Sequence, residues 1–90
     1  MVSIKKRKNK AWVTFNIDVE ANEVYLKGSW NNWEEEKMKK KKDGSFYLRK
    51  SLPMNKTYEF GYLIDGKWIN DNELETIKTP FGSKNSILRI

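Results

Sequence analysis

The chain of 90 residues contains no cysteine and no histidine. A disulfide scaffold is therefore excluded, and so is a metal site built from thiolate or imidazole ligands. Catalysis by a serine–histidine or cysteine–histidine pair is excluded for the same reason. No apolar run approaches the roughly 20 residues that a membrane-spanning helix requires. We therefore expect no cofactor, no bound metal and no membrane partner.

Basic residues dominate the first ten positions, but they lead into no apolar segment of the kind that a secretory signal contains. Residues 1–10 are predicted to form a flexible basic arm. Residues 11–90 are predicted to form one β-sandwich domain, because a chain of this length has no room for a second domain. The absence of a signal favours a cytoplasmic protein.

The formal net charge of +6 raises the question of nucleic-acid binding. Lysine and arginine gather in two clusters, at residues 5–10 and 37–42. The second cluster follows three consecutive glutamates, which partly cancel its field, and a solvated charged surface accounts for both clusters. No single strand carries a stripe of alternating basic and aromatic residues, so nucleic acid is the weakest candidate partner.

Apolar and polar residues alternate with period two along most of the chain, and no helical period is sustained. This alternation predicts strands over residues 12–19, 24–29, 38–42, 45–52, 57–64, 67–69 and 85–90. In the first of these strands the buried face carries Val13, Phe15, Ile17 and Val19. In the strand at residues 57–64, one face carries Tyr58, Phe60, Tyr62 and Ile64, and the outward face carries Glu59, Gly61 and Leu63. Asp43-Gly44 is predicted to form a tight primed hairpin turn, and Asp65-Gly66 a second hairpin turn. About seven short strands indicate an all-β, immunoglobulin-like β-sandwich, with a small closed barrel as the alternative.

The tryptophans are the main candidates for function. Trp30 continues the inward alternation of its strand and is expected in the core. Trp33 lies beyond the end of that strand, where an exposed indole gives up burial worth about 2–3 kcal/mol, so a role in ligand binding is favoured. Trp68 follows a short hairpin turn, and its direction is left open. Trp12 receives no role.

The carboxylates do not suggest catalysis. Glycoside hydrolysis requires two carboxyl groups at a defined separation. Glu34, Glu35 and Glu36 are consecutive, Asp43 and Asp65 are explained as turn residues, and Asp71, Glu73 and Glu75 fall in a polar loop. We therefore expect a protein that is not an enzyme.

Several segments together resemble carbohydrate-binding module family 48. The similarity runs through residues 24–33 (VYLKGSWNNW), 43–46 (DGSF), 52–53 (LP), 58–68 (YEFGYLIDGKW) and 81–88 (FGSKNSIL). The family includes the glycogen-binding domain of the β subunit of AMP-activated protein kinase and the N-terminal domains of isoamylases and branching enzymes. The resemblance implies an early-set immunoglobulin-like sandwich that binds α-1,4-linked glucan such as glycogen, starch-like polymer or maltooligosaccharide.

The resemblance also implies a set of binding residues. The two tryptophans that stack on glucose rings in the family correspond to Trp33 and Trp68. The positions that hydrogen-bond sugar hydroxyls correspond to Ser83 and Asn85, and the apolar residue that reaches into the curve of the glucan corresponds to Phe81. Asn32 occupies the turn beside the first tryptophan.

One departure concerns a lysine that contacts sugar in the kinase domain, because Gly61 stands at its position. Three functions are therefore open. The leading expectation is a glucan-binding module that acts alone or tethers a partner such as a kinase or a glucan-processing enzyme. The alternative is a protein-interaction or regulatory module without sugar binding, and the third is nucleic-acid binding.

Overall fold

The computed structural model describes residues 2–90, which form ten short strands and one turn of 3-10 helix. The elements are β1 (Val2–Arg7), β2 (Lys10–Ile17), β3 (Val24–Gly28), η1 (Ser29–Asn31), β4 (Glu36–Lys37), β5 (Lys39–Lys40), β6 (Phe46–Pro53), β7 (Thr57–Ile64), β8 (Lys67–Ile69), β9 (Thr76–Lys78) and β10 (Lys84–Arg89). Among these residues no helix is long and apolar enough to cross a membrane.

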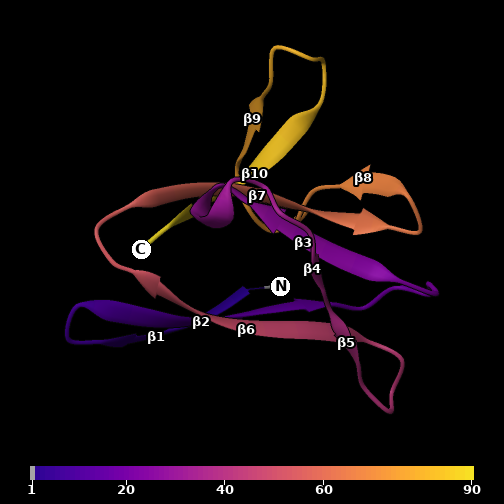
Figure 1. Ribbon diagram of the computed structural model, residues 1–90, viewed down its shortest axis with the longest axis horizontal. Coiled ribbons are helices and arrows are strands. Elements are labelled where there is room, and N and C mark those ends of the chain that lie inside the picture. The colour runs from indigo at the N-terminus through magenta and orange to yellow at the C-terminus, as the bar shows by residue number, and fades with distance from the viewer. Residues whose placement is uncertain (1) are drawn as a thin grey trace.

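The strands form two antiparallel sheets that face each other as layers (Figure 1). Sheet I has the strand order β1-β2-β6-β5. Sheet II has the order β4-β3-β7-β10-β9, and β8 also pairs with β7. The β9–β10 hairpin extends from sheet II away from sheet I (Figure 1). The predicted all-β sandwich is therefore confirmed.

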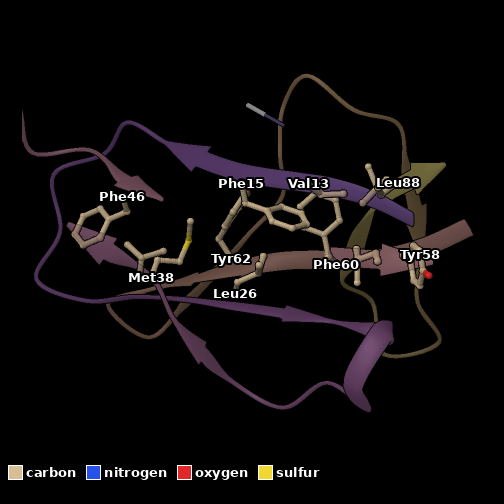
Figure 2. Packing of buried hydrophobic residues seen from close by; sticks show 12 residues of the cluster. Val13, Phe15, Leu26, Met38, Phe46, Tyr58, Phe60, Tyr62 and Leu88 are labelled. Atoms are coloured by element: carbon tan, nitrogen blue, oxygen red, sulfur yellow. The ribbon is translucent and has the colours of Figure 1, made fainter. Parts of the chain in front are cut away.

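The core fills the space between the sheets because alternate residues of the central strands point inward. Val13 and Phe15 of β2 point toward Phe60 and Tyr62 of β7, as Figure 2 shows. The Phe15 and Phe60 rings meet edge to face with their centroids 5.1 Å apart. The predicted inward faces of the strands at residues 12–19 and 57–64 are confirmed by this packing.

Trp30 lies at the edge of this core, as the alternation predicted. Its ring centroid is 5.3 Å from that of Phe15, and its Nε1 atom donates a hydrogen bond to Glu36. Glu36 also forms an ion pair with Lys50, a residue of β6 on the other sheet. This carboxylate therefore connects the two sheets beside Trp30.

The N-terminal segment was predicted as a flexible arm over residues 1–10, of which Met1 lies outside the described residues, and residues 2–10 differ from this prediction. Val2–Arg7 forms strand β1, which pairs antiparallel with β2 across its whole length. The pairing adds backbone hydrogen bonds to the edge of sheet I, and lysine on such an edge discourages pairing with further chains. The predicted boundary after residue 10 therefore falls inside a hairpin.

The turn at Asp43-Gly44 differs from the predicted two-residue primed turn. Only Gly44 has positive φ (92°), and the N–H of Gly44 donates to the carbonyl of Lys41. The side chain of Asp43 accepts hydrogen bonds from the hydroxyl and the N–H of Ser45, which lower the pKa of the Asp43 carboxyl below its ordinary value. By contrast, both Asp65 and Gly66 have positive φ, as a primed turn requires.

Candidate functional site

Strand alternation and pairing determine which side chains lie on the outer face of sheet II, the face turned away from sheet I. Because Phe60 and Tyr62 of β7 point into the core, Gly61 and Leu63 point outward. Trp68 of β8 pairs with Leu63, so its side chain shares this outer face. The direction of Trp68, which the sequence left open, is therefore outward.

The backbone around Trp33 sets the direction of its indole. After the 3-10 turn, Asn32 and Trp33 both adopt left-handed φ values, of 59° and 63°. The N–H of Trp33 donates a 3.0 Å hydrogen bond to the carbonyl of Gly28, which closes the turn. Left-handed φ is uncommon for a bulky residue, and such strain of about 1–3 kcal/mol tends to occur at functional sites. Asn32 itself is exposed beside the indole.

The indoles of Trp33 and Trp68 lie side by side. Their ring centroids are 6.3 Å apart and their planes make an angle of 59°. Both residues are half-buried, so part of each ring is open to solvent. We call these two side chains the indole platform. Two hollows of about 660 and 700 Å³ lie elsewhere on the molecule, and neither indole lines them.

Trp68 is held in place by a hydrogen bond and by a close backbone contact. Its Nε1 atom donates a 2.8 Å hydrogen bond to the carbonyl of Lys84, at the start of β10. Its ring lies directly against Gly61, where an added Cβ atom would come within 2.3 Å of Cζ2 of the indole. Gly61, which sequence reasoning treated only as the loss of a lysine, therefore gives the indole room to lie flat on β7.

Asn85 lies on β10, next to the residue that anchors Trp68. Its side chain is only 8% exposed, and its amide donates a 3.1 Å hydrogen bond to Oε1 of Glu59. This bond fixes the orientation of the amide and leaves the carbonyl oxygen of Asn85 with acceptor capacity. Sequence reasoning placed Glu59 on the outward face with Gly61 but gave it no role. The alternation of residues 57–64 was the sequence signal that could have indicated Glu59 as a site residue.

The turn between β9 and β10 carries the other two predicted site residues. Phe81 is 93% exposed at this turn, and the Ser83 hydroxyl is 2.8 Å from the hydroxyl of Thr79. The backbone N–H of Thr79 also donates to the carbonyl of Ser83. Among residues 2–90, no ring contact joins Phe81 to the indole platform. The structure thus brings Trp33, Trp68 and Asn85 together on one face and presents Phe81 and Ser83 on the adjoining hairpin.

Charged groups near the site do not form a metal centre. Within the part of the chain that the structure describes, no three acidic side chains are arranged to hold a metal ion. The polar groups beside the platform include the amide of Asn85 and the carboxylate of Glu59 that is bound to this amide. These groups can exchange hydrogen bonds with the hydroxyls of a neutral ligand.

Residues 12–90 match the family described as the glycogen recognition site of AMP-activated protein kinase. The chain belongs to this family. The match covers both tryptophans of the platform and the β9–β10 hairpin. The family is a glycogen-binding module of a kinase regulatory subunit, and this membership agrees with the resemblance found in the sequence.

Three relatives are longer proteins that contain a segment similar to this chain. The chain is 30% identical over 66 residues to SNF1-related protein kinase regulatory subunit beta-2 of Arabidopsis thaliana, covering 73% of this chain and 22% of the relative. It is 41% identical over 71 residues to the chloroplastic protein PTST homolog 2 of the same plant, covering 78% and 13%. It is 29% identical over 68 residues to 5'-AMP-activated protein kinase subunit beta-1 of Sus scrofa, covering 76% and 54%. The chain thus spans only part of each of these relatives.

Proposed function

We propose that this protein binds α-1,4-linked glucan without catalysis, on the outer face of sheet II. The observation that carries the proposal is the indole platform, where two half-exposed rings lie 6.3 Å apart with their planes 59° from each other. A glucose ring has one apolar face and a rim of hydroxyls. Two tilted indoles suit consecutive rings of a curved chain, because each ring can stack on its own indole.

The polar surroundings fit the rim of such a ligand. Asn85 is oriented by Glu59, and its carbonyl can accept a hydrogen bond from a sugar hydroxyl. The hydroxyl of Ser83 and the side chain of Asn32 lie at exposed positions. Phe81 extends an exposed ring from the β9–β10 turn, and burying it against a glucan would recover about 2–3 kcal/mol.

The expected affinity is modest. A sugar face that covers about 100 Å² of indole contributes about 2.5 kcal/mol. Two stacks and a few hydrogen bonds of about 1 kcal/mol each, less the cost of ordering the ligand, give a Kd between about micromolar and millimolar. Binding of this strength is effective on a polymer, where many equivalent sites raise the effective concentration.

The absence of catalysis is part of the proposal. Glycoside hydrolysis uses two carboxyl groups on either side of the bond that breaks. The platform instead offers two indoles, and the nearby Glu59 is engaged by the amide of Asn85. Because the relatives named above include subunits of kinases, the protein is suited to tether a kinase or a glucan-processing enzyme to the polymer in the cytoplasm.

Titration of intrinsic fluorescence with maltoheptaose tests the proposal. Wild-type protein is expected to give a saturable change, and Trp33→Ala and Trp68→Ala are each expected to weaken binding by about tenfold or more. Trp12→Ala is the matched control, because Trp12 is 44% exposed on β2 of the other sheet. Migration of wild-type protein at the same rate in native gels with and without glycogen would contradict the proposal. So would an equal effect of all three substitutions on maltoheptaose binding.

A further inference from the structure

We propose that Lys27 supplies the sugar-binding ammonium group that the resemblance assigns to the position of Gly61. The inference rests on the proposed function and names a further residue of the same site. Lys27 lies on β3 and is the direct cross-strand partner of Gly61 on β7. Cross-strand partners share one face of a sheet, so the lysine side chain stands on the outer face beside the indole of Trp68.

The strand geometry allows a lysine at position 27 of β3 to take the place of a lysine at position 61 of β7. Neighbouring strands lie about 4.8 Å apart, a distance that the four-carbon stem of a lysine can span. A lysine on β3 can therefore deliver its ammonium group to the space above β7. A lysine on Gly61 itself would collide with Trp68, since even a Cβ atom there would lie 2.3 Å from the ring. In this protein the indole occupies the surface of Gly61, and the cation stands one strand away.

Lys27 is also available for a ligand. Its side chain is half-buried, so its stem is packed on the sheet. Within residues 2–90, no carboxylate lies within ion-pair distance of its ammonium group and no hydrogen bond uses it. An ammonium group that is not engaged by the protein can donate up to three hydrogen bonds to sugar oxygens, and hydrogen bonds from charged donors are stronger than neutral ones.

Neighbouring side chains place the ammonium group within the site. Leu63 of β7 pairs with Tyr25 on one side and with Trp68 on the other, and all three lie on the outer face. The preceding residue, Tyr62, is buried in the core. Lys27 is two positions from Tyr25 on the same strand and therefore on the same face. The platform is thus bordered by Lys27 on the side of β3 and by Asn85 on the side of β10, so a sugar ring on Trp68 would meet a donor at one edge and an acceptor at the other.

The test compares binding of maltoheptaose by wild-type protein, Lys27→Met, Lys27→Arg and Lys37→Met in calorimetry. Methionine keeps the apolar stem and removes the charge. We expect Lys27→Met to weaken binding by about tenfold or more and Lys27→Arg to retain most of the affinity. Lys37 is the matched control, because it pairs with Tyr25 on the same face and forms an exposed ion pair with Glu23. Lys37→Met is expected to bind as the wild type does.

A second measurement uses the unmodified protein. Acetylation of lysine by a succinimidyl ester is followed by mass spectrometry with and without saturating maltoheptaose. Lys27 is expected to react severalfold more slowly in the presence of the sugar, while the rate at Lys37 stays the same. Wild-type affinity in Lys27→Met, or equal losses in Lys27→Met and Lys37→Met, would overturn the assignment of Lys27. The proposed function would survive that result if binding still depended on Trp33, whereas absence of binding by wild-type protein would overturn both.

Discussion

A Cβ atom on Gly61 would lie 2.3 Å from Cζ2 of Trp68, so the indole rests on the bare backbone of β7. The same indole is fixed at its other edge by the hydrogen bond from Nε1 to the carbonyl of Lys84. Trp68 is thereby held between β7 and β10, and its ring centroid lies 6.3 Å from that of Trp33. The lack of a side chain at Gly61 is a structural requirement of the platform.

Gly61→Ala is therefore expected to weaken glucan binding severalfold. The added methyl group forces the indole to move, and overpacking of this kind typically costs about 1–3 kcal/mol. Maltoheptaose titration and thermal unfolding of the variant measure both effects. The control is a double-mutant cycle with Trp68→Ala, in which Gly61→Ala should add little once the ring is gone. Additive losses in the cycle would contradict this account.

Glu36 is expected to matter for stability more than its exposed neighbours do. Its carboxylate accepts hydrogen bonds from Trp30 and Asn31 and pairs with the half-buried Lys50. Glu36→Ala should lower the free energy of unfolding by about 1–3 kcal/mol, because it leaves the half-buried ammonium group of Lys50 and the indole N–H of Trp30 without their acceptor. Urea denaturation measures the change, with the exposed Glu34→Ala as the control. Equal stability of the two variants would show that the pair contributes nothing.

Tyr62 is expected to make the fold sensitive to high pH. Burial, together with the charge of Asp71, raises the pKa of the Tyr62 hydroxyl well above its ordinary value. Above about pH 10 an unfolded tyrosine loses its proton, while the folded one keeps it. The unfolded state then binds fewer protons, so stability falls as the pH rises beyond that point.

Chemical denaturation between about pH 8 and 11 tests this expectation. Tyr62→Phe should flatten the decline in stability on the alkaline side, because phenylalanine has no proton to lose. At neutral pH the same variant should be less stable by about 1–3 kcal/mol, because Asp71, which is 3% exposed, loses a hydrogen bond from the tyrosine hydroxyl. Tyr25→Phe serves as the less buried control. An unchanged alkaline slope in Tyr62→Phe would refute the assignment.

The fold class and the inward faces of the main strands follow from the amino-acid pattern alone. Alternation with period two predicted that Val13, Phe15, Phe60 and Tyr62 share the core, and all four are buried. The period sufficed because each of these strands has one buried face, which fixes the side on which every side chain lies. The same alternation placed Trp30 in the core and Trp33 beyond the strand.

The way in which separate segments meet depends on the folded arrangement of the strands. The contact of Trp33 with Trp68, the support of Trp68 by Gly61 and the position of Lys27 opposite Gly61 all depend on strand pairing. The basic residues of the first segment became strand β1 because β2 offered an unpaired edge, which local composition does not reveal. Strands that are distant along the chain pair in the arrangement that lets the two sheets bury their apolar faces against each other. For this reason the residue types of the site could be read from the sequence, whereas their arrangement required the fold.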